Sequence, residues 1–278
     1  MALATPDLVV VGHICRDVVA EPPGWRPGGA VFYAASTAAK LGYAVGVVTA
    51  GASEVEVLHE LPNTVVVNLE AKASTSFQNV YESDGRRQYL RALAPPIPPE
   101  ILPSEWRKTP LALLAPVAGE VPPAMARAFG QGLLGVSPQG YMRELLVGEE
   151  VGYQTWNHAL DVLQHAAVVI FSEEDVHGHS ASWLSYCGPV LVMTRGELGC
   201  ELMHCGKKRH VPGFPCAEVD PTGAGDVFAA AFMLKLCETR EPVEAARFAN
   251  CVASFSVTAR GTEGLPSLEQ VQERLSTW

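Results

Sequence analysis

The sequence predicts an α/β protein with a mostly parallel sheet and helices on both of its faces. Short, wholly apolar runs such as Leu8–Val11 and Val45–Ala50, each closed by a glycine, are typical of strands buried on both faces. Helical patterns separate several of these runs, and that alternation indicates parallel strands. Of the 278 residues 48% are apolar, which favours a packed core over disorder.

The first helix is predicted directly after a pair of glycines. Gly28 and Gly29 precede Ala30–Leu41, a stretch rich in small residues, and Gly42 ends it as a C-cap. Further along the chain, the same reasoning predicts buried strands at Leu111–Ala115, Leu133–Val136, Val168–Phe171 and Val190–Thr194, and helices at Pro122–Gly130, Thr155–His165, His179–Tyr186, Val243–Arg260 and Ser267–Leu275.

Two segments do not follow this alternation. Asp17–Pro27 is short and proline-rich, and Thr75–Leu93 has the pattern of a hairpin turning at Ser83-Asp84-Gly85. We expect them to form a small sheet over the site, a lid of approximately residues 16–28 and 74–94. Since the proline run that follows, Pro95–Pro99, suits a stiff connector, we expect residues 1–278 to form a single domain.

The composition narrows the classes of molecule that the protein could bind and the compartment in which it could work. The net charge of −10 argues against nucleic acid and anionic membranes. It also repels a nucleoside triphosphate, which would need Mg²⁺ and local basic groups. The chain shows no signal peptide and no run of roughly 20 apolar residues that could span a membrane. The seven cysteines are scattered and odd in number, which favours reduced thiols and a cytoplasmic location.

The most informative stretch is Asp220–Asp226, a glycine-rich turn that ends in a carboxylate and opens a long apolar helix. Helix N-termini present unpaired N–H groups and the positive end of the dipole, so they bind anions. Gly223 and Gly225 let the backbone approach a phosphate closely. We expect the N–H groups of Gly223, Ala224 and Gly225 to form an anion hole and Asp226 to accept the proton of an acceptor hydroxyl. This pattern predicts phosphoryl transfer.

The stretch Asp220–Asp226 resembles the second signature of the ribokinase-like (PfkB) carbohydrate kinases. Gly28-Gly29 with the following helix resembles that family's N-terminal motif, and Thr194–Gly199 resembles its nucleotide loop. The motifs occur in family order across nearly the whole chain. Gly12–Asp17 and Val219–Thr222 look most like the inositol-kinase branch. The resemblance implies a ribokinase-like three-layer α/β/α fold with a mostly parallel central sheet and a small β lid.

The resemblance also implies roles for single residues. Asp17 matches the family's aspartate that binds substrate hydroxyls, and Gly28, Gly29 and Tyr33 would line the acceptor site with it. The nucleotide would contact Thr194, Arg195, Gly196, Gly199, Thr222 and Asn250. The implied cofactors are ATP and Mg²⁺, and a monovalent cation is a further option.

Two departures from the family pattern stand out. Where the family carries Asn-x-x-Glu near Mg²⁺, this chain reads Ser172-Glu173-Glu174-Asp175. We therefore expect Glu173 or Asp175 to act on the metal through water. Tyr33 stands where the family often has an asparagine facing the substrate, and its ring would shrink the pocket and add a stacking face.

Asp226 presents a conflict, because a helix N-terminus should lower its pKa and weaken it as a base. In a loose transition state the proton leaves late, so that orienting the hydroxyl matters more than basicity. Elsewhere, His177 and His179 lack further clustered ligands for a metal, Lys207–Arg209 suit a solvated hairpin turn, and the lid residues Arg86, Arg87 and Arg91 are candidates to reach a phosphate.

The predicted function is an ATP- and Mg²⁺-dependent kinase that phosphorylates a hydroxyl of a sugar or cyclitol. A nucleoside kinase of the same fold is the alternative within the class. From another class, a catalytically inactive sugar-sensing protein on a kinase scaffold fits the altered Ser172–Asp175 motif, whereas the intact anion hole and Asp226 oppose it. A small lid would leave a sheet face exposed, and a homodimer would cover it.

Overall fold

The computed structural model describes residues 4–22, 24–82, 85–130, 132–176 and 190–278. Its main sheet has nine strands among these residues, in the order β15-β14-β13-β12-β9-β8-β1-β4-β5. All neighbours pair in parallel except β13–β14 and β14–β15. The strands are β1 (Leu8–Val11), β4 (Val45–Gly51), β5 (Thr64–Glu70), β8 (Leu111–Leu114), β9 (Leu133–Val136), β12 (Val168–Ser172), β13 (Val190–Thr194), β14 (Cys200–His204) and β15 (Lys207–Val211).

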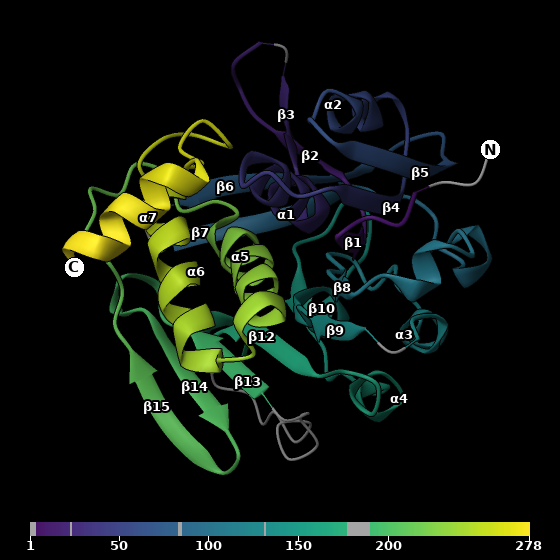
Figure 1. Ribbon diagram of the computed structural model, residues 1–278. Coiled ribbons are helices and arrows are strands. Elements are labelled where there is room, and N and C mark those ends of the chain that lie inside the picture. The colour runs from purple at the N-terminus through teal and green to yellow at the C-terminus, as the bar shows by residue number, and fades with distance from the viewer. Residues whose placement is uncertain (1–3, 23, 83–84, 131, 177–189) are drawn as a thin grey trace.

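Helices cover both faces of this sheet (Figure 1). One apolar core contains residues of α1, α2, α5, α6 and α7, and a second core on the opposite face contains residues of α3 and α4. The predicted three-layer α/β/α fold is therefore confirmed. The helices are α1 (Ala30–Lys40), α2 (Glu56–His59), α3 (Pro123–Ala128), α4 (Ala159–Leu163), α5 (Ala224–Thr239), α6 (Pro242–Ser256) and α7 (Leu268–Thr277).

A second sheet has the order β3-β2-β6-β7. It contains β2 (Cys15–Val18), β3 (Trp25–Gly28), β6 (Thr75–Glu82) and β7 (Gly85–Ala92), so two distant parts of the chain build it. Strands β2 and β6 are its parallel pair, and the outer pairs are antiparallel. Below we call these four strands the small sheet. A separate two-stranded ribbon consists of β10 (Arg143–Glu144) and β11 (Gly152–Tyr153).

One predicted turn is a strand, and several predicted features lie outside the described residues. Lys207–Arg209 belong to strand β15 and not to a turn; the turn lies at Cys205-Gly206, both with positive φ. The expected helix at His179–Tyr186, the pair His177 and His179, Cys187 and the turn residues Ser83-Asp84 lie outside the described residues. The six described cysteines are free thiols. No helix in the described part of the chain is long and apolar enough to cross a bilayer.

Candidate active site

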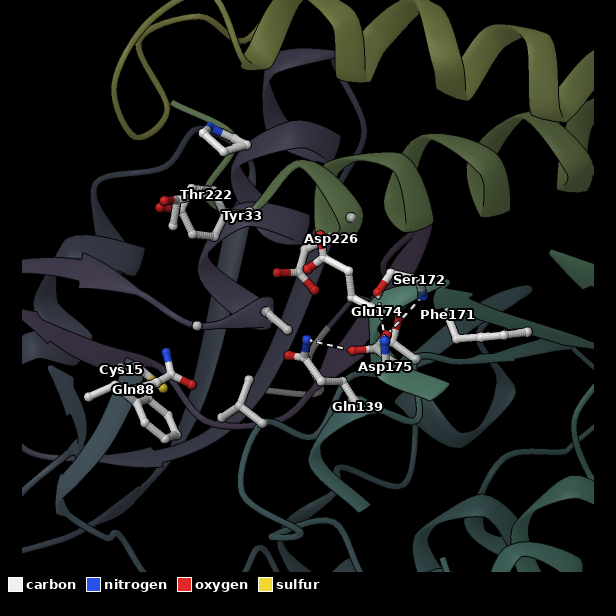
Figure 2. Close-up of a pocket in the computed structure, with 18 of the residues that line it drawn as sticks. Cys15, Tyr33, Gln88, Gln139, Phe171, Ser172, Glu174, Asp175, Thr222 and Asp226 are labelled. Carbon is white, nitrogen blue, oxygen red and sulfur yellow. Dashed lines mark hydrogen bonds between the residues drawn. The ribbon is translucent and has the colours of Figure 1, made fainter. Parts of the chain in front are cut away.

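A cavity of about 250 Å³ lies between the small sheet, the carboxyl ends of several main-sheet strands and the start of α5 (Figure 2). In open α/β sheets this edge is where ligands bind. Asp17, Tyr33, Thr222, Gly223 and Asp226, all predicted as site residues, line the cavity together. We call it the acceptor cavity.

The glycine-rich turn has a specific hydrogen-bonding pattern. Gly223 is the N-cap of α5 and adopts a left-handed conformation, with φ 77° and ψ 0°. Its carbonyl oxygen accepts hydrogen bonds from the N–H groups of Asp226 (3.0 Å) and Val227 (2.9 Å). The Ala224 N–H donates to the Pro221 carbonyl oxygen at 3.1 Å. Within the described residues, no hydrogen bond uses the N–H groups of Gly223 and Gly225, so these two N–H groups remain available to a ligand, whereas that of Ala224 does not.

Asp226 has a different acidity from the one that its helix position suggests. Its side chain is partly buried and lines the acceptor cavity, and desolvation raises the pKa of Asp226 to about 7. Arg143 opposes this shift by lowering the pKa, and the carboxylate of Asp175 adds to it. The expectation of a lowered pKa is wrong, because loss of hydration outweighs the helix dipole at this position. A carboxylate with a pKa near neutrality is well matched to general-base work.

The two glycines after β3 allow the close packing that places Asp17. The ring of contacts is tight: a Cβ on Gly28 would lie 2.2 Å from Oδ2 of Asp17, and a Cβ on Gly29 would lie 2.6 Å from the carbonyl oxygen of His13. Gly29 also has φ 86°, a region that side chains disfavour. Asp17 and Gly29 line the acceptor cavity as expected, whereas Gly28 packs against Asp17 and is not in the lining.

Tyr33 is 4% exposed and lines the acceptor cavity from the first turns of α1. Its ring lies against Gly223, so the face expected to stack on a substrate is covered on that side by the turn. Burial, reinforced by the charges of Asp17, Asp220 and Asp226, raises the pKa of the Tyr33 phenol well above its usual value. The hydroxyl is therefore protonated at neutral pH.

Two hydrogen bonds join Ser172 and Asp175. Ser172 is the last residue of β12, and Asp175 lies in the 3₁₀ turn η5 (Glu174–Val176). The Ser172 N–H donates to Oδ2 of Asp175 at 2.8 Å, and the Asp175 N–H donates to Oγ of Ser172 at 3.1 Å. Gln139 Nε2 donates to the other carboxylate oxygen at 2.9 Å (Figure 2). Asp175 thus holds the turn in place as well as lining the cavity.

Glu173 was expected near the metal, but its neighbour Glu174 is the glutamate that lines the acceptor cavity. Glu174 lines it beside Asp175, whereas Glu173 lies outside the lining and forms an ion pair with Arg195 at 3.3 Å. The described residues contain no group of three or more His, Cys, Asp or Glu side chains placed to hold a metal ion. Two neighbouring carboxylates nevertheless fit Mg²⁺, which keeps much of its water and binds phosphates.

A second cavity, of about 460 Å³, adjoins the first, and both are lined by Thr194, Pro221 and Gly225. Gly196 and Gly199, around the 3₁₀ turn η7 (Gly196–Leu198), line it as expected. We call it the donor cavity. Its lining is largely apolar and includes Leu198, Phe214, Phe228, Ala253 and Val257.

Three of the expected nucleotide contacts are placed differently. Arg195 lies outside the linings of both cavities and pairs with Glu173 and Glu201. Thr222 lines the acceptor cavity instead of the donor cavity. Asn250 lines the donor cavity, but its amide donates to the carbonyl oxygens of Val211 and Pro212, both at 3.1 Å. These two hydrogen bonds hold the end of β15 against α6.

Several polar lining residues escaped the sequence reasoning. Asn79 and Gln88, on β6 and β7, share a hydrogen bond of 3.0 Å. Arg143 donates to the Val117 carbonyl oxygen at 3.0 Å and lies 5.4 Å above the ring of Phe77. No motif marks these residues, because strand pairing and a short ribbon bring them to the cavity. The lid arginines Arg87 and Arg91 are not in its lining; the Arg86 side chain is outside the described residues.

Glu120 fixes the loops beneath the cavity. This residue is 3% exposed, and its carboxylate accepts hydrogen bonds from the N–H groups of His13 (2.7 Å), Val117 (3.1 Å) and Ala118 (2.7 Å). The loops after β1 and β8 are therefore tied to one carboxylate.

Comparison with known proteins shows similarity to carbohydrate and nucleoside kinases. Residues 159–268 match the pfkB family carbohydrate kinases. The chain is 36% identical to ribokinase of Bacillus subtilis over 126 residues, 44% of this chain and 42% of the relative. It is 26% identical to cytidine kinase of Thermococcus kodakarensis over 243 residues, 82% of this chain and 87% of that one. The match to ribokinase thus spans less than half of its length.

Among solved structures, a pyrophosphate-dependent kinase in the ribokinase family, complexed with a pyrophosphate analog and myo-inositol, superposes with a TM-score of 0.80. The match covers 96% of this chain and 99% of that one, at 20% sequence identity. At this identity, the likeness establishes the fold.

Proposed function

We propose that this chain transfers a terminal phosphoryl group to a hydroxyl of a small polyol, because residues 159–268 match the pfkB family carbohydrate kinases. The observation that carries the proposal is the position of Asp226. It lies in one cavity with Asp17, at the start of a helix whose turn leaves two N–H donors for an anion, and burial raises its pKa to about 7.

The residues suggest the following chemistry. Asp17 accepts hydrogen bonds from acceptor hydroxyls and orients them. Asp226 takes the proton of the reacting hydroxyl as its oxygen bonds to the terminal phosphorus and the bond to the bridging oxygen of the donor breaks. The N–H groups of Gly223 and Gly225 stabilise charge on the transferred group. Glu174 and Asp175 would hold Mg²⁺ through water, and the bound ion would neutralise charge on the donor phosphates.

We propose a nucleoside triphosphate, ATP, as the donor. The adenine base and ribose of ATP could occupy the donor cavity and contact its apolar walls, whereas pyrophosphate has no group that would fill it. A pyrophosphate donor is the second candidate, because the neighbour of similar fold is pyrophosphate-dependent. The assay below therefore includes both donors.

For the acceptor, we favour a sugar or cyclitol over a nucleoside. The acceptor cavity carries hydrogen-bonding side chains on several sides, from Asp17, Asn79, Gln88 and Gln139. The ring of Tyr33 is covered by Gly223 on one face, so it is a poor platform there for a base. The cytidine kinase relative keeps the nucleoside as the alternative.

The experiment is a phosphoryl-transfer assay with Mg²⁺, using ATP or pyrophosphate against inositols, hexoses, ribose and nucleosides. Asp226→Asn should lower kcat by at least roughly 10²–10⁴-fold, the usual contribution of a positioned base. Asp161→Asn, an exposed carboxylate on α4, serves as the matched control and should retain full activity.

The outcomes separate the hypotheses. Turnover that survives Asp226→Asn would overturn the proposed mechanism. Ligand binding by a folded protein without turnover of any acceptor would favour the inactive sugar-sensing protein. In a further variant, Ala253→Phe, the donor cavity is partly filled; it should weaken use of ATP and leave pyrophosphate unaffected.

A further inference from the structure

Tyr33 and Gly223 come from opposite ends of the chain and meet beneath the catalytic turn. A Cβ built on Gly223 would lie 2.4, 2.4 and 2.5 Å from Cδ1, Cγ and Cδ2 of Tyr33. Nearly equal distances to these three carbons put that position over the face of the ring and not at its edge. The α-carbon of Gly223 therefore packs on the flat face of the tyrosine.

The ring itself is held firmly. It is 4% exposed, and it meets the ring of Phe32 edge-to-face, with centroids 5.4 Å apart at 69°. Close packing of this kind transmits small shifts in position.

Gly223 is linked directly to the base. Its carbonyl oxygen accepts the Asp226 N–H at 3.0 Å, and its left-handed φ of 77° begins α5 without a side-chain cap. A shift of Gly223 would move the backbone of Asp226 and the two N–H donors together. Oδ1 of Asp220 accepts the Thr222 N–H at 3.0 Å, and the Asp220 N–H donates to the Val257 carbonyl oxygen at 3.1 Å, so these bonds hold the start of the turn. The Tyr33 ring is the side chain that packs directly against Gly223.

We propose that the Tyr33 ring is a positioning residue that sets the place of the Gly223–Asp226 turn relative to α1, the helix that follows the glycines next to Asp17. The inference rests on the proposed function for its kinetic consequence, but its structural content does not. It assigns the flat ring a task separate from contact with the acceptor.

The test compares Tyr33→Phe, which keeps the ring, with Tyr33→Leu, which removes it. A misplacement of about 1 Å can cost about 10²-fold in rate. We expect Tyr33→Leu to lower kcat by about 10- to 10²-fold with little change in the acceptor KM, and Tyr33→Phe to retain most of kcat. Phe248→Leu, a buried aromatic of α6 outside both cavity linings, controls for general loss of core packing.

A second measurement does not need activity. Hydrogen exchange of the segment 223–228 should quicken in Tyr33→Leu and stay unchanged in Tyr33→Phe and Phe248→Leu. Tyr33→Met also removes the flat ring but keeps an apolar side chain, and it is the second variant if Tyr33→Leu does not fold; it should lower kcat and quicken the exchange in the same way.

Three results would overturn the inference. They are a rise in the acceptor KM alone, a loss in Tyr33→Phe equal to that in Tyr33→Leu, and unchanged exchange in Tyr33→Leu. If the parent protein phosphorylates no acceptor, the proposed function fails, and the exchange measurement still decides the role of the ring.

Discussion

Asp226 shows how a local rule can be outweighed by its surroundings. The helix N-terminus favours the ionised carboxylate, but removal of water by the surrounding protein disfavours it more strongly, and the pKa of Asp226 rises to about 7. Arg143 reduces the rise, and Asp175 increases it. In the proposed mechanism, Asp226 would therefore be able to take a proton near neutral pH.

This acidity predicts a pH dependence. Below its folded pKa, Asp226 carries a proton and cannot accept another, so kcat/KM should fall about tenfold per pH unit on the acid side. The midpoint should lie near pH 7, well above the usual value for aspartate. The measurement is kcat/KM from pH 5 to 9, with circular dichroism at each pH to confirm folding. A profile that stays flat down to pH 5 would contradict it.

At this scale the sequence predicted residues that belong to motifs and missed those that do not. Asp17, Gly29, Tyr33 and Asp226 all reach the acceptor cavity as expected. The choice between Glu173 and Glu174 depends on the direction of a single turn, which the sequence does not specify. Three acidic residues in a row give no signal for which one points inward.

At the scale of elements, Glu120 links loops that follow two different strands. Three backbone N–H groups, of His13, Val117 and Ala118, donate to its buried carboxylate. The His13 ring in turn lies between Oγ1 of Thr75 (2.8 Å) and the carbonyl oxygen of Pro95 (2.9 Å). Through these bonds the ends of β1 and β8 are joined to the base of the small sheet.

Glu120→Ala would leave these buried N–H groups without an acceptor. Each unsatisfied group costs about 1–3 kcal/mol, so the free energy of unfolding should fall by about 3 kcal/mol or more. Glu120→Gln keeps one acceptor oxygen and should lose less. Urea unfolding measures both, with exposed Glu149→Ala as the control. A loss below about 1 kcal/mol in Glu120→Ala would show that the loops do not depend on this carboxylate.

The elements that the sequence predicted well are those buried on both faces. Leu8–Val11, Leu133–Val136 and Val190–Thr194 were expected with the bounds they have. Strands β5, β14 and β15 of the main sheet were missed; β5 and β15 lie at its edges, and β14 is the antiparallel strand beside β15. An edge strand has a neighbouring strand on one side only, so more of its side chains are exposed to solvent and they need not be apolar. In Lys207–Val211 only Val211 is buried.

At the scale of the whole molecule, one buried carboxylate fastens the small sheet to the main body. Glu54, in the turn η1 (Ser53–Val55) after β4, is 5% exposed. It pairs with Nε of Arg16 on β2 at 3.1 Å and accepts the Ser74 hydroxyl at 2.7 Å. Ser74 precedes β6, so Glu54 meets both segments that build the small sheet.

Arg16→Ala should therefore cost more than the loss of an ordinary surface ion pair. It leaves a buried carboxylate with one fewer donor, for which we expect a loss of about 1–3 kcal/mol in the free energy of unfolding. Arg26→Ala is the matched control, since Arg26 pairs with exposed Glu21 at 3.9 Å and such pairs contribute about 0–1 kcal/mol. Equal losses in the two variants, measured by urea unfolding, would contradict this.

The pairing of β2 with β6 has a consequence for the order of assembly during synthesis. Cys15 pairs with Thr75, and α5, which carries Asp226, packs on α1 from near the end of the chain. During synthesis, β2, which carries Asp17, is therefore made well before β6. Until β6 has been made, the edge of β2 that pairs with it remains unpaired. Such long-range pairing is slow to form. Both β2 and α5 contribute residues to the acceptor cavity, so this cavity is completed only after α5 has been synthesised.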